Sequence, residues 1–128
     1  MRLLLDTHAL LWWLAGDAQL SPRAQRAIGD RRHEILVSAA SAWEVCTKHR
    51  LGKLPGAGPL AVDFEREVRR QGFAALPIAM SHAQSAGALP IAPLDPFDRM
   101  LLAQARAEHL AIVSNAVVFD GHGVKRIW

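Results

Sequence analysis

Three carboxylates lie at positions where a chain of alternating strands and helices commonly has its functional site. Asp6 follows the apolar run 3–5, Glu44 follows a second apolar run, and Asp98 lies in a stretch opened by Asp95. Because ligands of parallel sheets bind beyond the carboxyl ends of the strands, we expect these three acids to converge. Like charges in a partly buried site raise one another's pKa unless a cation compensates them. Oxygen ligands without a cysteine set or paired histidines favour Mg2+ or Mn2+ over zinc.

Each acid also has a structural interpretation. Asp6 is a candidate cap for the helix that follows, although Thr7 is available for that role. Glu44 is spaced to pair with Lys48 at i,i+4, while its apolar neighbours favour a less exposed position. From its own segment alone, Asp98 is better explained as the third residue of a capped helix. The combination of all three positions is what favours a site.

The elements that position these acids are predicted from hydrophobic runs, caps and breakers. Strands are expected at residues 2–5, 34–37, 74–78, 110–113 and 124–128. Helices are expected at residues 7–15, 21–32, 40–51, 60–71, 81–88 and 95–109. This alternation predicts an α/β sandwich with a central, mainly parallel, five-stranded sheet.

Length and composition limit the class of protein. The chain has 128 residues, which suits a single domain over residues 1–128, and its hydrophobic content of 51% excludes a disordered chain. A net charge of +3 is weak evidence for a nucleic-acid partner, and the apolar surplus suggests a partner surface. Cys46, the sole cysteine, excludes an internal disulfide and suits a reducing, cytoplasmic location. The N-terminal apolar stretch is too short to span a membrane, so no membrane association is expected.

Four segments together resemble the PIN-domain ribonucleases of the VapC-type toxin class. They are LLLDTHALLWWL at 3–14, VSAASAWEVCTKHRLGKL at 37–54, LDPFDRMLLAQA at 94–105 and IVSNAVVFDGHGV at 112–124. The resemblance implies a three-layer α/β/α fold with an acidic pocket that holds one or two Mg2+ or Mn2+ ions and cleaves RNA. It implies catalytic and metal-binding roles for Asp6, Glu44 and Asp98. It also implies that Thr7 and Ser38 supply hydroxyls to the pocket.

The chain departs from the family pattern after the strand predicted at 110–113. Relatives carry a further aspartate there, whereas this chain has Ser114, Asn115 and then Ala116, which we expect to line the pocket. Asp120 and Asn115 are close in sequence, but neither matches the motif position. We therefore expect a second metal ion to bind weakly or not at all, and turnover to be low.

Two hypotheses of different classes follow. The first is a Mg2+-dependent endoribonuclease toxin in which water attacks the RNA phosphodiester in line. The second is a catalytically weak binding module whose main role is capture of an antitoxin or RNA. Trp12 and Trp13, on the apolar helix 7–15, are the candidate partner-binding residues, with core packing as the alternative for at least one of them. The resemblance also implies a homodimer and a small cognate antitoxin.

Overall fold

Five strands form one sheet in residues 1–91 and 94–128, the part of the chain that the computed structural model describes. They are β1 (Arg2–Leu5), β2 (Glu34–Ser38), β3 (Ala74–Leu76), β4 (Ala111–Val113) and β5 (Arg126–Ile127). The spatial order is β3-β2-β1-β4-β5, and each of these pairings is parallel. The predicted sheet is therefore confirmed, with β1 at its centre.

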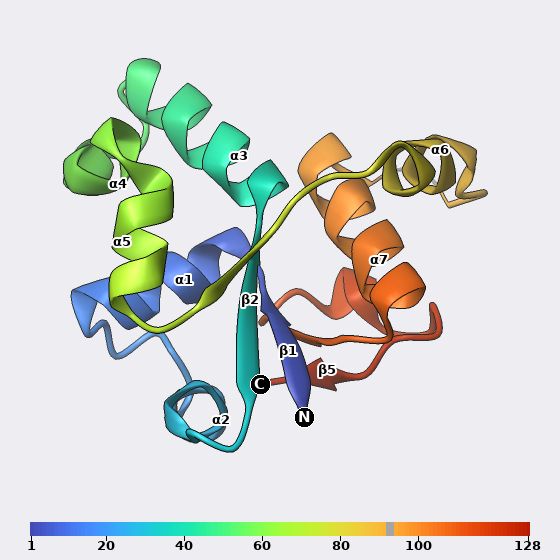
Figure 1. The fold of residues 1–128 in the computed structure, drawn as a ribbon, viewed down its shortest axis with the longest axis horizontal. Coiled ribbons are helices and arrows are strands. Elements are labelled where there is room, and N and C mark those ends of the chain that lie inside the picture. The colour runs from blue at the N-terminus through green and yellow to red at the C-terminus, as the bar shows by residue number, and fades with distance from the viewer. Residues whose placement is uncertain (92–93) are drawn as a thin grey trace.

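Helices cover both faces of this sheet (Figure 1). The described helices are α1 (Thr7–Ala15), α2 (Pro22–Gly29), α3 (Ala39–Arg50), α4 (Gly58–Val62), α5 (Phe64–Arg70), α6 (Met80–Ala88) and α7 (Pro96–Glu108). Short 3-10 turns lie at η1 (Pro55–Ala57) and η2 (Val117–Phe119). Among the described residues, no helix combines the length and the apolar character needed to cross a membrane.

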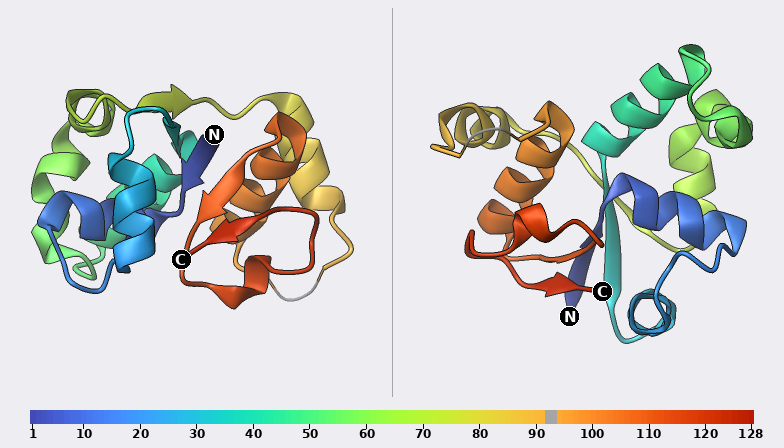
Figure 2. Two further views of the ribbon diagram at one scale, coloured as in Figure 1. Left: turned by 90° about the horizontal axis from the view of Figure 1, so that it is seen from below. Right: turned by 180° about the vertical axis from the view of Figure 1, so that it is seen from behind.

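The central strand shows how the layers are held together. Leu3 and Leu5 pack with α1, α2 and α5 on one face, whereas Leu4 packs with α7 on the other. This follows from the alternation of side chains along a strand, and all three leucines are fully buried. The result is a three-layer α/β/α sandwich, which confirms the predicted fold class. Both views in Figure 2 show α6 beside α7, on the side of the sheet away from α1.

One predicted helix is wrong. Residues 60–71 form two helices, α4 and α5, because the chain breaks at Asp63 with φ −150° and ψ 84°. The Asp63 carboxylate accepts a hydrogen bond from the Arg66 N–H and so begins α5. An aspartate that bonds nearby backbone favours a helix start over a helix interior, and here this preference overrides the amphipathic pattern.

Other predicted bounds are too long. β3 stops before Pro77, which has no N–H to donate to a strand ladder, so the strand predicted at 74–78 is shorter. The strand predicted at 124–128 is reduced to β5. The helix predicted at 21–32 ends at Gly29, and Asp30 instead accepts a hydrogen bond from the Arg32 N–H in a turn. None of these changes moves the ends of β1 and β2 that face the candidate site.

Candidate active site

Asp6 is the residue at which the central strand passes into α1. It is 7% exposed, and its carboxylate accepts a hydrogen bond of 2.8 Å from the Ala9 N–H. Asp6 is therefore the N-cap, and the alternative in which Thr7 takes that role is wrong, because Thr7 is already the first helical residue. Burial raises the pKa of Asp6 and Glu44 adds to it, whereas hydrogen bonds from Ser114 and Ala9 oppose this shift.

Glu44 lies on the inner side of α3 and fits both interpretations of its sequence position. It is 6% exposed, and it also forms the i,i+4 ion pair with Lys48. The Thr7 hydroxyl donates a hydrogen bond of 2.6 Å to Glu44 Oε1. The buried Ser41 hydroxyl lies 3.0 Å from Thr7 Oγ1. Sequence reasoning missed Ser41, although its position three residues before Glu44 places both on one helical face.

Asp98 lies in the first turn of α7, whose N-cap is Asp95 as predicted. Asp95 Oδ1 accepts hydrogen bonds from the N–H groups of Phe97 and Asp98. Burial, followed by the negative charges of Asp95, Glu44 and Asp6, raises the pKa of Asp98 to about 6, and Lys48 opposes this rise. The influence of both other acids on its pKa indicates that Asp98 faces the same end of the sheet as Asp6 and Glu44.

Within the described part of the chain, Ser38 makes no hydrogen bond to Asp6, Glu44 or Asp98, the three residues of the acidic cluster. It is the N-cap of α3, where its hydroxyl oxygen accepts a hydrogen bond of 2.9 Å from the Ala40 N–H. The same hydroxyl donates to Gln104 Oε1 on α7. The structure therefore gives Ser38 a structural partner and does not bring it into contact with the carboxylates.

The predicted pocket residues in the loop after β4 differ in burial and in their contacts. Ser114 is fully buried beside Asp6, and its hydroxyl also accepts the Ala116 N–H at 2.9 Å. Ala116 is half-buried and Asn115 is exposed. Asp120 pairs with Arg126 at 2.8 Å, which holds the pKa of Asp120 below its usual value. Asp120 thus has a cationic partner of its own and does not supply the missing carboxylate.

The donor set fits a hard divalent cation in part. Among the described residues, no three His, Cys, Asp or Glu side chains gather closely enough to hold a metal ion by themselves. Asp6 and Asp98 nevertheless offer carboxylate oxygens, and burial, with a smaller effect from neighbouring carboxylates, raises both pKa values, a shift that a bound cation would oppose. Mg2+ is bound through as few as one or two carboxylates, with waters and substrate phosphates completing the shell. Two acids are therefore sufficient donors for that ion.

Comparison with protein families identifies the family of the fold. The model of the PIN domain family matches residues 3–120, which is most of the chain. The chain belongs to the PIN domain family. The resemblance predicted from the four sequence segments is thereby confirmed.

One curated relative of this PIN domain is named as a ribonuclease. Ribonuclease VapC16 from Mycobacterium tuberculosis (strain ATCC 25618 / H37Rv) is 44% identical over 73 residues, which are 57% of this chain and 49% of that protein. The match thus spans about half the length of the curated relative.

Solved structures match the PIN domain over nearly its whole length at low identity. VapBC2 from Rickettsia felis, bound to a promoter DNA fragment, gives a TM-score of 0.71 at 13% identity, covering 98% of this chain and 97% of that one. DNA-bound VapBC from Salmonella typhimurium gives 0.64 at 17% identity, covering 98% and 96%. A toxin-antitoxin complex from Klebsiella pneumoniae gives 0.60 at 19% identity, covering 92% and 90%. These matches support the three-layer fold.

The two tryptophans on α1 of the PIN domain have different surroundings, although both are partly buried against the core. Trp13 donates a hydrogen bond of 3.1 Å from Nε1 to Gln71 and packs on Phe73. Trp12 contacts His8 and Trp128 and lines two hollows, one of about 250 Å3, which Trp13 also lines, and one of about 280 Å3. Core packing therefore accounts for part of both side chains, and Trp12 is the one that borders both hollows.

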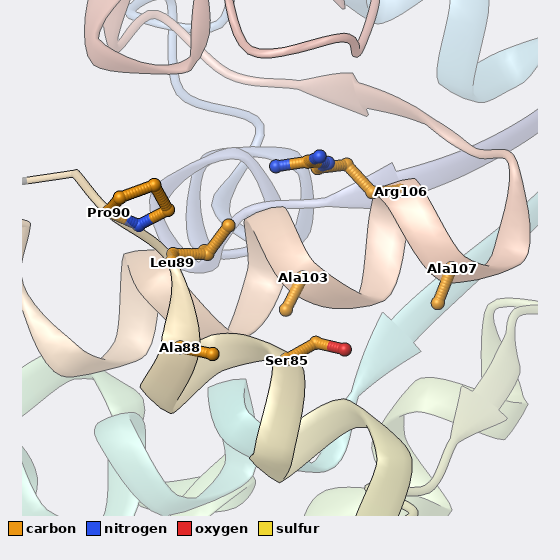
Figure 3. Close-up of a pocket in the computed structure, with 7 residues that line it drawn as sticks. All are labelled: Ser85, Ala88, Leu89, Pro90, Ala103, Arg106 and Ala107. Carbon is orange, nitrogen blue, oxygen red and sulfur yellow. The ribbon is translucent and has the colours of Figure 1, made fainter.

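A larger hollow of about 470 Å3 lies between α6 and α7 (Figure 3). Ser85 and Ala88 line it from α6, and Ala103 and Arg106 line it from α7. No acid is among its lining residues within the described part of the PIN domain. The acidic cluster is therefore the better candidate active site, on chemistry rather than on size.

Proposed function

We propose that this PIN domain is a metal-dependent endoribonuclease that hydrolyses RNA phosphodiester bonds as the toxin of a toxin-antitoxin pair. The observation that carries the proposal is the raised pKa of Asp98, to which the charges of Glu44 and Asp6 contribute from separate segments of the chain. Thr7, the residue after Asp6, donates a hydrogen bond of 2.6 Å to Glu44, which brings two of these acids to the same end of the sheet. Acids grouped in this way are a mark of functional sites. The similarity to a protein named as a ribonuclease supports the same reaction.

Asp6 and Asp98 are the residues that would hold Mg2+ or Mn2+. Such a cation, when bound, lowers the pKa of water and offsets charge that builds up on the phosphate. Glu44 would orient the attacking water, because its carboxylate is itself fixed by Thr7 and Lys48. Asp6 is fixed in turn by its hydrogen bond to Ala9. With both carboxylates held in place, water attack in line with the leaving oxygen needs little rearrangement of the protein.

The neutral side chain of Ala116 limits this activity in our proposal. A fourth carboxylate at this position would add oxygen ligands beside Asp6, since Ser114 of the same loop bonds to Asp6. Without it, we expect one ion to bind and turnover to be slow.

The test is cleavage of a labelled single-stranded RNA by a chain that carries Ala116→Asp. In Mg2+, Asp6→Asn in this background is expected to lower the rate about a hundredfold or more, because several kcal/mol of charge stabilisation would be lost. Asp120→Asn is the matched control, because Asp120 is an exposed carboxylate paired with Arg126. Equal rates for Asp6→Asn and its background would show that the site is wrong. Failure of the Ala116→Asp chain to cleave in either Mg2+ or Mn2+ would refute the ribonuclease function.

Capture of an antitoxin is the second candidate role, and the two hollows that Trp12 lines favour it. Three solved structures with this fold are toxin-antitoxin or VapBC complexes, which supports a partner of the same kind here. We also propose a homodimer, on the apolar surplus of the sequence, and a cytoplasmic location, on its lone cysteine. If Trp12→Ala leaves the affinity for a co-expressed cognate antitoxin unchanged, Trp12 is not the docking residue.

A further inference from the structure

Two aromatic side chains flank the acidic cluster, each one residue before an acid. Trp43 precedes Glu44 on α3, and Phe97 precedes Asp98 on α7. Their ring centroids are 5.0 Å apart with an interplanar angle of 74°, an edge-to-face contact. Because the contact joins two helices, it fixes the orientation of the Trp43 ring relative to both acids.

The Trp43 ring is open to solvent. It is 64% exposed, whereas its neighbour Glu44 is 6% exposed. An edge-to-face contact with one partner leaves the indole with a free aromatic surface. A large apolar ring that is held rigid yet exposed is a suitable surface for stacking, since little side-chain freedom is lost when a flat ligand binds.

The surroundings of Trp43 favour a nucleic acid over a second copy of this chain. Thr47 and Arg50 follow at four and seven residues along α3, and helical spacing places them on the same face as Trp43. Arg50 is exposed and Thr47 is half-buried. The centre of a homodimer interface is apolar and poor in charge, whereas sites for single-stranded nucleic acids combine aromatic rings with cations.

We propose that an unpaired base of the RNA substrate stacks on Trp43, with Phe97 bracing the ring, and thereby positions the neighbouring phosphodiester at the acidic cluster. The inference rests on the proposed ribonuclease function and narrows its substrate to RNA with at least one unstacked base. Stacking is suited to this place because the carboxylates repel a phosphate, and base stacking supplies affinity that does not depend on charge. Every base has an aromatic face, so the contact tolerates many sequences.

The test is binding of a short, fluorescein-labelled, single-stranded RNA of mixed sequence, measured by anisotropy in EDTA so that no metal-dependent cleavage occurs. Trp43→Leu is expected to weaken binding about tenfold, and Trp43→Phe to retain most of the affinity. Met80→Ala, which shortens an exposed apolar side chain on α6, is the matched control and is expected to change nothing. Binding of a fully paired RNA duplex is expected to be the same for the parent and Trp43→Leu.

A series of RNAs with one abasic position provides a readout that misfolding would not imitate. Removing the base that stacks on Trp43 is expected to weaken binding to the parent about tenfold and to leave binding to Trp43→Leu unchanged. This is the result expected when the base and the Trp43 ring are the two partners of one contact. Equal affinity of the parent and Trp43→Leu, or no binding by the parent, overturns the proposal. The proposal is also overturned if light scattering shows that the loss of affinity results from dissociation of a dimer. In that case Trp43 would lie in an interface with a second copy of the chain.

The outcomes separate this proposal from the ribonuclease function on which it rests. A stacking site that persists in a chain unable to cleave RNA in Mg2+ or Mn2+ would refute the nuclease and leave an RNA-binding module. Cleavage that proceeds with Trp43→Leu binding as tightly as the parent would leave the nuclease intact and refute the stacking site.

Discussion

Polar side chains near the two ends of α7 have different electrostatic surroundings. Near its beginning, Asp98 shares the acidic cluster with Asp6 and Glu44, and the pKa values of both aspartates are raised. Toward its end, Gln104 is fully buried and forms hydrogen bonds to two uncharged groups, the Ser38 hydroxyl and the Pro77 carbonyl. Both regions enclose polar atoms, but only the first gathers like charges.

The network around Gln104 leaves its members paired. Gln104 accepts from the Ser38 hydroxyl and donates to the Pro77 carbonyl at 3.1 Å. His82 Nδ1 accepts the Ala79 N–H at 3.0 Å, and its Nε2 lies 2.9 Å from Glu108. The difference shows that this chain provides hydrogen-bond partners for buried polar groups in a region with no candidate site. Asp6 and Asp98, which form no ion pair among the described residues, therefore point to a ligand at the acidic cluster rather than to poor packing.

The largest expected effect comes from breaking the paired network. Gln104→Ala removes the partners of Ser38 and Pro77 and leaves a cavity, so the free energy of unfolding should fall by about 3 kcal/mol. Urea denaturation measures it. Gln84→Ala, an exposed glutamine on α6, is the control and should change stability by less than about 0.5 kcal/mol. Equal stability of the two variants would remove the contrast between the two regions.

A change of intermediate size is expected from adding charge to the acidic cluster. Ala116→Asp should raise the rate of Mg2+-dependent RNA cleavage about tenfold, because in our proposal the added carboxylate becomes a further oxygen ligand of the acidic cluster. The same variant should be less stable than the parent in EDTA, since a further negative charge then lacks a cation. Asn115→Asp adds the same charge at an exposed position and serves as the control. A rate equal to that of the parent would show that position 116 does not limit activity.

The smallest expected effect is a dependence of stability on pH in metal-free buffer. The pKa of Asp98 is about 6 in the folded chain and near its ordinary value of 3.8 in the unfolded chain. The folded state therefore binds more protons between these values, and stability should fall as the pH rises from 4 to 6. Because Asp98 is partly exposed, we expect its share to be about 1 kcal/mol. Asp98→Asn should flatten this slope, whereas Asp120→Asn should not. An unchanged slope in Asp98→Asn would refute the assignment.

Much of the fold was predictable because local signals and tertiary structure agree. The leucine run 3–5 is apolar throughout and becomes the central strand, and the Asp95 cap begins α7 as its sequence predicts. The break at Asp63 was missed because periodicity over residues 60–71 indicates one continuous helix. A single side-chain hydrogen bond to the backbone decided that segment. The assignment of the whole chain to one domain stays a prediction.

The candidate site was predictable in part. Placing acids after buried strands identified Asp6 and Glu44, since the backbone alone carries them to one edge of the sheet. The hydrogen bond from Ser38 to Gln104 could not be predicted from the sequence. Gln104 is distant in sequence and reaches Ser38 only through the packing of α7. The exposure of Trp43 was equally hidden, since an aromatic residue in an apolar stretch is usually interpreted as core.

The loop after β4 already has a backbone that an aspartate adopts without strain. Position 116 is extended, with φ −82° and ψ 107°, and its N–H is held by the hydroxyl of Ser114 rather than by any feature of the alanine side chain. Two of the four alanine codons differ from an aspartate codon by a single nucleotide, and the other two differ by two. In evolutionary terms, one or two nucleotide changes therefore separate the present chain from one with an aspartate at position 116, and selection on the gene can move between them without rebuilding the loop.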